Sequence, residues 1–351
     1  MVEKGTERVI RSVAPVRICD NGGWTDTWFA RSGKVFNIAV SPLVEVEVRQ
    51  YRYVLRPRPE RVLLRAVNFG DEYAVDPEGP GEGRHPMLEA AIRRAAIPAD
   101  VALDIRLRSD APPGASMGTS AAVTVALVGA LDALTPGRRA PQEVAEAAHS
   151  IEVDALRRQS GVQDQLCSAH GGIIFIDMYE YPHARVERLA LAAPLLDELA
   201  RRLVVVYLGR SHDSSAVHEK VIRELEDAGP DDPRLAALRE AALDSRTAVL
   251  AGDLESLGRA MNANTSAQAR LHPDLVGHDA QRVIDHARAH GAVGVKVNGA
   301  GGEGGSLTLL GSAKDAERQS MIDAILGVSS LFRRVPIELS PHGLVVTETE
   351  G

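Results

Sequence analysis

Apolar and polar positions alternate in several stretches of the first half of the chain, the pattern of strands with one buried face. The clearest case is VEVEVRQYRYVL, residues 44–55, where valines alternate with charged and aromatic side chains. Residues 9–18 and 101–107 are further predicted strands, and GGIIFIDM, residues 171–178, contains a short buried one. Residues 56–84 are rich in proline, glycine and charge, which favours loops with short strands.

Helical periodicity dominates the middle of the chain. Residues 87–96 have a helical pattern, and residues 142–158 are predicted to form an amphipathic helix. The segment SDAPPGASMGTSAAVTVALVGALDAL reads as a strand exit, a Pro-Gly turn and a helix with so few charges that we expect it to be buried on most sides. Further helices are predicted from residue 212 to residue 290, interrupted by loops at 229–233 and 272–273.

Strands return in the C-terminal half, and they are predicted at residues 203–208, 293–297, 306–310 and 335–339. Strands and helices do not alternate with the regular βαβ spacing of a doubly wound sheet. The length of 351 residues favours two domains, at roughly 150 residues per domain. We therefore predict a two-domain α+β protein, with an N-terminal mixed α/β domain over residues 1–190 and a C-terminal α+β domain over residues 191–351.

The composition is that of an ordinary soluble globular protein, with 44% hydrophobic and 25% charged residues. The net charge of −8 provides no basic field for nucleic acid or an anionic membrane. Cys19 and Cys167 have no metal-ligand spacing and fit a reducing compartment, and the eleven histidines lack the HExxH spacing of a zinc hydrolase. The first 17 residues lack the apolar stretch of a signal peptide, and the longest apolar run, residues 121–131, has about half the length of a bilayer span. We expect a cytoplasmic protein with no nucleic-acid or membrane partner.

The segment DAPPGASMGTSAA, residues 110–122, carries the strongest chemical signal. Gly114 completes a tight turn after two prolines, and Gly118 removes a side chain just before Thr119 and Ser120 begin a helix. Converging backbone N–H groups and the positive end of the helix would bind a di- or triphosphate, and a hydroxyl there would reach a phosphate oxygen or Mg²⁺. No lysine follows the glycine, so the segment is not a Walker A motif. A helix cap that binds no ligand is the alternative.

Three other segments carry weaker signals. KVNGAGGEGGSL, residues 296–307, has five glycines in seven positions, which indicates either close approach to a ligand or a flexible hairpin. APVRICDNGGWTDT, residues 14–27, ends a strand in two glycines with Asp26 just beyond, a common strand ending. In GVQDQ, Asp164 follows the helix that carries Glu152, and such an aspartate is usually a surface helix cap.

In this order, the four segments resemble motifs of the GHMP kinase superfamily, which includes galactokinase, homoserine kinase, mevalonate kinase and phosphomevalonate kinase. APVRICDNGGWTDT is similar to A-P-G-R followed by G-E-H-T-D-Y, with Gly23 and Trp24 in place of Glu-His. PPGASMGTSAA is similar to P-x-G-x-G-L-G-S-S-A-A, and VNGAGGEGGSL to G-A-G-G-G-G with Glu303 where glycine is usual. IEVDALRRQSGVQDQ resembles the segment in which I-E is followed by G-x-x-D-Q. The first motif is nearest to those of L-fucose kinase and D-glycero-D-manno-heptose 7-phosphate kinase.

The resemblance runs from about residue 8 to residue 311 and implies the two-domain GHMP kinase fold, with the active site between the domains. It implies a monomeric or homodimeric ATP-dependent sugar kinase that requires Mg²⁺. The acceptor would be the anomeric C1 hydroxyl of a heptose 7-phosphate or of a free hexose or 6-deoxyhexose. Two alternatives remain: a kinase for a non-sugar alcohol such as mevalonate or homoserine, and a catalytically silent sugar and nucleotide sensor. The sensor is considered because the Glu303 carboxylate would repel phosphates unless it points away or meets a cation.

The resemblance also implies roles for individual residues. Asp164 resembles the catalytic aspartate that accepts the substrate hydroxyl proton, and Arg17 the basic residue that supports it. Ser120 and Glu152 resemble the pair that holds Mg²⁺, and Asp26 resembles an acceptor of hydrogen bonds from sugar hydroxyls. The remaining implied contacts are Gly114, Ala115, Gly118, Thr119 and Ser120 for the nucleotide phosphates, and Gly23, Trp24, Gly299, Gly301 and Gly302 for the substrate.

Overall fold

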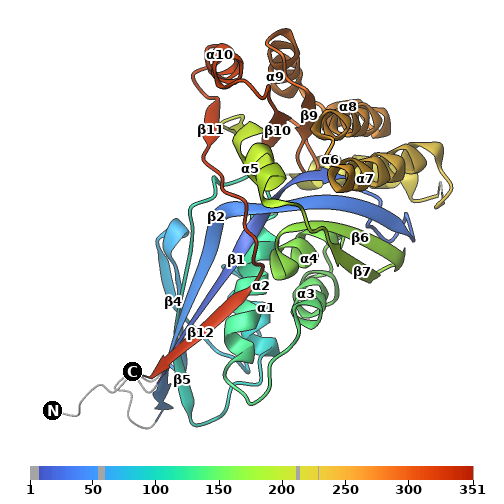
Figure 1. Cartoon of the computed structure of the whole chain (residues 1–351). Coiled ribbons are helices and arrows are strands. Elements are labelled where there is room, and N and C mark those ends of the chain that lie inside the picture. The colour runs from blue at the N-terminus through green and yellow to red at the C-terminus, as the bar shows by residue number, and fades with distance from the viewer. Residues whose placement is uncertain (1–7, 54–59, 211–213, 228, 351) are drawn as a thin grey trace.

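A computed structural model describes residues 8–53, 60–210, 214–227 and 229–350, which contain a larger and a smaller β-sheet with helices packed against both (Figure 1). The strands of the larger sheet are β1 (Arg8–Asn21), β2 (Gly33–Arg52), β3 (Val62–Ala66), β4 (Asp71–Val75), β5 (Val101–Ser109), β6 (Ile173–Glu180), β7 (His183–Arg188) and β12 (Val345–Glu350). The α+β class predicted from the sequence is therefore confirmed.

The long strand β2 organises the larger sheet, whose strand order is β12-β1-β2-β5-β3-β4. The first part of β2 pairs with β6, which pairs in turn with β7, and its second part pairs with β5. On its other side, β2 pairs with β1 along most of its length. These pairings are antiparallel, and only β3 and β5 run parallel within this described sheet. Val44, Val46 and Val48 are buried, whereas Glu45 between them is exposed. The alternation in the sequence thus reflects a strand with one face packed against the core and the other face toward solvent.

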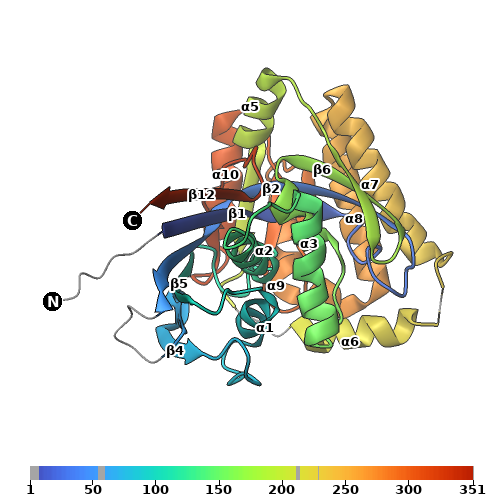
Figure 2. The same ribbon diagram turned by 90° about the horizontal axis from the view of Figure 1, so that it is seen from below.

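Four helices of the N-terminal half cover one face of the larger sheet (Figures 1 and 2). They are α1 (Pro86–Arg94), α2 (Thr119–Asp132), α3 (Pro141–Ser150) and α4 (Gln163–His170). Helix α2 packs against β1, β2, α3 and α4, and its alanines and valines are buried on nearly every side. This placement explains its low charge and brings its N-terminus to the end of β1.

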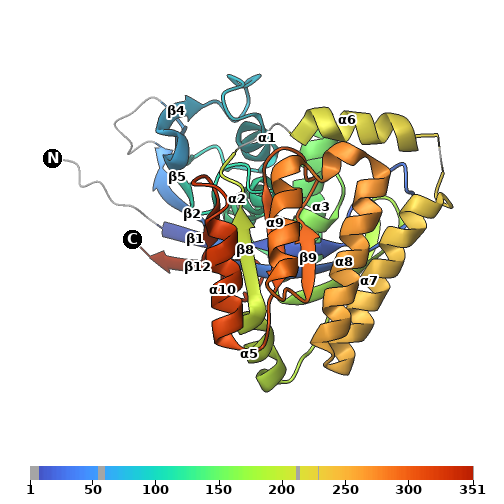
Figure 3. The same cartoon turned by 90° about the horizontal axis from the view of Figure 1, so that it is seen from above.

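The smaller sheet has the order β11-β8-β10-β9 with antiparallel pairing, and its strands are β8 (Leu203–Tyr207), β9 (Gly294–Val297), β10 (Ser306–Leu310) and β11 (Arg333–Val335). The helices of this half are α5 (Ala193–Arg202), α6 (Ser214–Leu225), α7 (Pro233–Ala251), α8 (Leu254–Leu271), α9 (His278–Ala289) and α10 (Asp315–Leu326). Helices α7 and α8 lie side by side (Figure 3), and they contact β2 and β9 respectively. This helix pair therefore connects the two sheets.

Two predicted elements differ from the structure. The helix predicted over residues 142–158 is α-helical only to Ser150, and Ile151–Ala155 form a π-helical turn, a feature that often occurs at functional sites. The strand predicted over residues 335–339 lies at β11, Arg333–Val335. The unpredicted strand β12 pairs with β1, so the end of the chain returns to the larger sheet. The division near residue 190 stays a prediction.

Among the helices described by the structure, none is both long and apolar enough to span a bilayer.

Candidate active site

Three of the four segments singled out in the sequence line one cavity of about 1030 Å³. These segments are the end of β1, the segment between α3 and α4, and the loop between β9 and β10. None of Gly114, Ala115, Gly118, Thr119 and Ser120 in the loop before α2 lines the cavity, but Gly118 packs against Asp164 and Arg17, which do. Its lining includes Arg17, Asp20, Trp24, Asp26, Glu152, Arg157, Arg158, Ser160, Gly161, Gln163, Asp164, Arg223 and Gly299. A cavity of this volume is large enough for a nucleotide phosphate tail together with a small acceptor.

Arg17 and Asp164, which both line the cavity, form a two-point ion pair. Arg17 Nε lies 2.8 Å from Asp164 Oδ1 and Arg17 Nη2 lies 3.3 Å from Oδ2, while Nη1 donates to the carbonyl oxygen of Ser116. The arginine side chain is 5% exposed and the aspartate 29%, so the carboxylate is the member open to a ligand. Burial lowers the pKa of Arg17, but Asp164 and Asp20 outweigh it and the net shift is upward. The guanidinium is therefore a permanent positive charge beside Asp164.

The loop before α2 has the conformation that its glycines require. Gly114, Ser116 and Gly118 have positive φ angles of 68°, 56° and 70°. A Cβ atom on Gly118 would lie 3.2 Å from the carboxylate of Asp164 and 3.3 Å from Arg17 Cγ. Gly118 therefore gives the loop its left-handed turn and also makes room for the ion pair. Because Gly118 is the N-cap of α2, the positive end of this buried helix lies beside the ion pair of Arg17 and Asp164.

Contacts from β1 and from the smaller sheet hold this loop in place. The carbonyl oxygen of Ala115 accepts a hydrogen bond from Ser306 Oγ at 2.6 Å, and that of Pro113 accepts one from Tyr207 Oη at 2.9 Å. The Ala115 side chain is buried, so only its backbone is available to a ligand. Thr119 lies half-buried in the first turn of α2.

The proposed Mg²⁺ ligands lie on different elements. Ser120, in the first turn of α2, is exposed, and its hydroxyl donates to Met87 Sδ at 3.3 Å. Within the described residues no three His, Cys, Asp or Glu side chains cluster as a metal site. A site completed by phosphate oxygens and water does not need such a cluster, since Mg²⁺ commonly takes only one or two carboxylates from the protein.

Glu152 lies in the π-helical turn and lines the cavity. Its Oε2 accepts hydrogen bonds from Gln165 Nε2 at 2.9 Å and from Ser160 Oγ at 3.2 Å, so both of these bonds use the same carboxylate oxygen. Burial, together with the negative charge of Asp164, raises the pKa of Glu152. A bound cation would offset both effects, and the donors present therefore fit Mg²⁺.

Asp26 is the most buried carboxylate that lines the cavity, together with Asp20. Its Oδ2 accepts a hydrogen bond from the backbone N–H of Gln163 at 3.0 Å. Burial is the main reason that its pKa rises to about 6, with a further contribution from Asp164. Gly161 packs directly on this carboxylate, because a Cβ there would lie 2.1 Å from Asp26 Oδ2.

Gly23 and Trp24 form the turn after β1. A Cβ on Gly23 would lie 3.1 Å from both Asp20 Oδ2 and Gln163 Nε2, so this glycine packs among the polar groups of the site. Trp24 has a φ of 79°, is 6% exposed and lines the cavity, and its ring also belongs to a hydrophobic cluster with Leu235 and Leu238 of α7. The substrate contacts predicted for both residues stay predictions.

The glycines of the loop between β9 and β10 have different surroundings. Gly299 lines the cavity and would place a Cβ 3.1 Å from Ser116. Gly301 and Gly302 instead lie on Leu275: a Cβ on Gly301 would be 1.9 Å from the Leu275 carbonyl oxygen, and Gly302 N–H donates to that oxygen at 3.2 Å. Neither is among the residues that line the cavity, so the structure does not bring them together with the other candidate residues.

Glu303 points to the N-terminus of α9. Its Oε1 accepts a hydrogen bond from the backbone N–H of His278 at 3.2 Å. The positive end of that helix is a favourable place for a carboxylate. The phosphate repulsion that motivated the sensor alternative is therefore avoided by the direction of this side chain.

The sequence analysis missed Asp20 and Lys296, which form a buried ion pair at 3.1 Å next to the cavity. A signal was present in the sequence: Lys296 is a lysine inside GVKV, a stretch otherwise suited to a buried strand. It also missed Arg157 and Arg158, which line the cavity. No pattern in the sequence distinguishes these two arginines from arginines on the surface.

The arrangement unites an anion-binding loop, a guanidinium-paired carboxylate and a further buried carboxylate, which suits phosphoryl transfer from a nucleotide to an alcohol. Residues 86–172 match the model of the GHMP kinases N terminal domain. The chain is 28% identical over 247 residues to a mevalonate kinase from Methanothermobacter thermautotrophicus, covering 69% of this chain and 74% of that protein. It is 26% identical over 321 residues to a bifunctional fucokinase/GDP-fucose pyrophosphorylase from Arabidopsis thaliana, covering 87% of this chain but 30% of that protein.

The fold is similar to that of a D-glycero-D-manno-heptose 1-phosphate kinase from Bacteriodes thetaiotaomicron, with a TM-score of 0.73 and 18% identity over 97% of this chain and all of that one. These comparisons support the GHMP kinase superfamily as the family of this chain. The chain is accordingly an ATP-dependent phosphotransferase with an alcohol group as acceptor.

Proposed function

We propose that this kinase phosphorylates a sugar at the anomeric C1 hydroxyl, with a heptose that already carries a phosphate as the foremost acceptor and a free hexose or 6-deoxyhexose as the next. The observation that carries the proposal is Asp26, a buried carboxylate that lines the same cavity as Asp164. A carboxylate in that position accepts hydrogen bonds from a ligand rich in hydroxyl groups. The similarity to a fucokinase over most of the chain supports a sugar acceptor.

In this proposal Asp164 accepts the proton of the acceptor hydroxyl while the hydroxyl oxygen attacks the γ-phosphorus. The bond between that phosphorus and the β–γ bridging oxygen breaks, and ADP leaves with the bonding electrons. Arg17 keeps Asp164 oriented through their two-point ion pair and offsets negative charge on the transferring group. Gly299 would let the backbone approach the acceptor.

The loop before α2 would hold the nucleotide phosphates through its backbone N–H groups, with Gly114, Ala115, Gly118 and Thr119 as its lining. Ser120 and Glu152 would hold Mg²⁺, which neutralises phosphate charge when it is bound.

Arginines in the cavity favour an acceptor that is itself an anion. Arg157, Arg158 and Arg223 all line it. A guanidinium binds phosphate through paired N–H donors, so a sugar phosphate would use these side chains where a neutral hexose would not.

A mevalonate-type acceptor is the second candidate, because the similarity to the archaeal mevalonate kinase covers 69% of this chain. Mevalonate carries a carboxylate, which the same arginines would bind. Asp26 would then have fewer hydroxyl partners, and this is why we place the sugar first.

The decisive experiment measures ADP release from Mg-ATP with a panel of heptose 7-phosphates, free hexoses, 6-deoxyhexoses, mevalonate and homoserine. Phosphorus NMR then identifies the phosphorylated position. An anomeric phosphate formed from one sugar would support the proposal, whereas turnover of mevalonate alone would replace it with the second candidate. Silence across the panel with intact ATP binding would favour the sensor alternative.

Asp164→Ala is the matching catalytic control. Its turnover should fall by roughly a hundredfold or more, the scale of a lost positioned acid–base group, while ATP binding is retained. Equal turnover in the variant and the wild type would remove Asp164 from the mechanism.

A further inference from the structure

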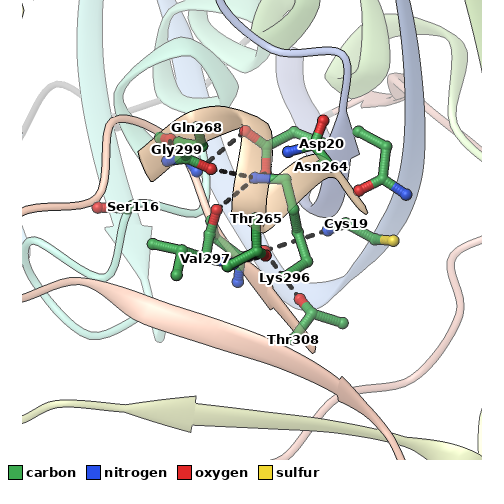
Figure 4. A network of polar contacts seen from close by, with 12 residues as sticks. Cys19, Asp20, Ser116, Asn264, Thr265, Gln268, Lys296, Val297, Gly299 and Thr308 are labelled. Carbon is green, nitrogen blue, oxygen red and sulfur yellow. Dashed lines mark hydrogen bonds and ion pairs between the residues drawn. The ribbon is translucent and has the colours of Figure 1, made fainter. Parts of the chain in front are cut away.

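The buried ion pair between Asp20 and Lys296 adjoins the candidate active site, because Asp20 lines the cavity. Figure 4 shows the polar contacts around the pair. Lys296 Nζ is 3.1 Å from Asp20 Oδ1, and both side chains are 1% exposed. Asp20 belongs to β1 of the larger sheet and Lys296 to β9 of the smaller one. The pair therefore joins the two sheets at the wall of the cavity.

Stability alone does not account for such a pair. Two charges lose their hydration on burial, and well-packed apolar residues of similar size are often at least as stabilising. Burial indeed lowers the pKa of Lys296, although Asp20 partly compensates. Across the described part of the chain, no other lysine-carboxylate pair is buried to this extent: the pairs made by Lys34, Lys220 and Lys314 are all substantially exposed.

The pair and its neighbours hold Gly299 from two sides. Asp20 Oδ2 accepts the Gly299 N–H at 2.9 Å, and Gln268 Nε2 donates to the Gly299 carbonyl oxygen at 3.0 Å. Lys296 Nζ in turn donates to Gln268 Oε1 at 3.2 Å and to the Val297 carbonyl oxygen. Figure 4 shows these side chains converging on Lys296.

Asp20 is also within reach of Arg17. Arg17 Nη1 lies 3.9 Å from Asp20 Oδ1, whereas Arg17 Nε lies 2.8 Å from Asp164 Oδ1. The Arg17 guanidinium thus lies between the carboxylates of Asp164 and Asp20. Lys296 pairs with Asp20 Oδ1, the same oxygen that lies nearest to Arg17. Without the ammonium group, the full charge of Asp20 would attract Arg17 away from Asp164.

We propose that Lys296 is a positioning residue for phosphoryl transfer, which neutralises Asp20 so that Arg17 stays on Asp164, while Asp20 supplies the oxygen that fixes Gly299. This inference rests on the roles proposed above for Arg17 and Asp164. It assigns no contact with the reacting atoms to Lys296, and it predicts that the charge of Asp20 is harmful once the lysine is removed.

The test compares Lys296→Met with two double variants, Asp20→Asn/Lys296→Met and Asp20→Leu/Lys296→Met. Steady-state kinetics would use Mg-ATP and the panel acceptor with the highest wild-type rate, well below each melting temperature. Lys296→Met should lose at least about tenfold in kcat, with less than about threefold change in KM for ATP, because a misplaced group chiefly affects turnover. Asn at position 20 should restore most of kcat, since it keeps an oxygen for Gly299 without the charge. Leu should not, since it offers no acceptor.

Lys34→Met is the matched control, because Lys34 forms an ion pair with Asp177 at 2.7 Å and neither residue lines the cavity. The kcat of this variant should equal that of the wild type. Wild-type turnover in folded Lys296→Met, or a kcat in the Asn double variant as low as in Lys296→Met, would overturn the proposal. If Lys296→Met does not fold, the two double variants still decide, because equal kcat values in them would contradict the role of the oxygen.

A crystal structure separates this inference from the proposed function. In Lys296→Met, the distance between Arg17 Nη1 and Asp20 Oδ1 should fall below 3.9 Å as the guanidinium leaves Asp164. An unmoved Arg17 would reject the inference even if no panel acceptor is turned over. Failure of the proposed function appears instead as a silent wild-type enzyme.

Discussion

The two glycine-rich loops of the site are similar in composition, yet they use glycine for different purposes. In the loop before α2, Gly118 faces the ion pair of Arg17 and Asp164. In the loop between β9 and β10, Gly301 faces the backbone of Leu275, outside the cavity. The first glycine keeps a side chain away from charged groups, and the second lets two chain segments pack closely.

This difference separates effects on turnover from effects on stability. A side chain added beside the ion pair disturbs the geometry of the reacting groups. A side chain added against a backbone carbonyl disturbs folding and leaves the cavity wall alone. Substitutions in the two loops should therefore give opposite patterns in kinetics and in unfolding experiments.

Gly301→Ala should have the largest effect. The new Cβ would lie 1.9 Å from the Leu275 carbonyl oxygen, and the φ of 67° is unfavourable for alanine. We expect a loss of roughly 2–5 kcal/mol in the free energy of unfolding, from left-handed strain and overpacking together. Urea unfolding measures this, and kcat of the folded fraction should stay within about twofold of the wild type. A stable but inactive variant would contradict the packing role.

The Asp26 carboxylate gives the next prediction, because a third glycine, Gly161, packs against it and leaves it buried. The pKa of that carboxylate is raised from 3.8 to about 6, so the folded protein binds its proton more tightly than the unfolded chain does. Between pH 4.5 and pH 7, the wild type should lose roughly 2 kcal/mol of stability relative to Asp26→Asn. Urea unfolding of both proteins at pH 4.5 and pH 7 measures the difference. Parallel stability curves would show that Asp26 titrates normally.

Gly118→Ala should reverse the pattern of Gly301→Ala. Its Cβ would lie 3.2 Å from the Asp164 carboxylate, so a shift of a few tenths of an ångström would move the ion pair. We expect roughly tenfold or greater loss of kcat, together with about 1–2 kcal/mol of left-handed strain in the free energy of unfolding. ADP release and urea unfolding on the same preparation measure the two effects. Unchanged kcat would remove the distinction between the loops.

Glu303→Gln should have the smallest effect. The variant loses a negative charge at the N-terminus of α9 and keeps a hydrogen-bond acceptor for the His278 N–H. The expected loss of stability is about 0.3–1 kcal/mol, lower at high salt. Thermal unfolding at low and high salt measures it. A clear gain in ATP affinity would show instead that Glu303 repels phosphates.

Local patterns in the sequence determined much of the fold and of the site. The alternation at residues 44–48 and the apolar run of α2 are visible because side-chain periodicity reports which face is buried. The position of Gly118 just before a helix likewise indicates an anion site, because such a site is built from backbone N–H groups of residues adjacent in the sequence. The motif resemblance supplied Arg17 and Asp164, which the structure places 2.8 Å apart.

Only the tertiary structure decided contacts between distant segments. Asp20 and Lys296 are separated by 276 positions, and no local pattern indicates that β1 and β9 bring them together. The same holds for the direction of Glu303 and for the packing of Gly301 on Leu275. The physical reason is that periodicity records how strongly a side chain is buried, whereas its partner depends on how the two sheets meet.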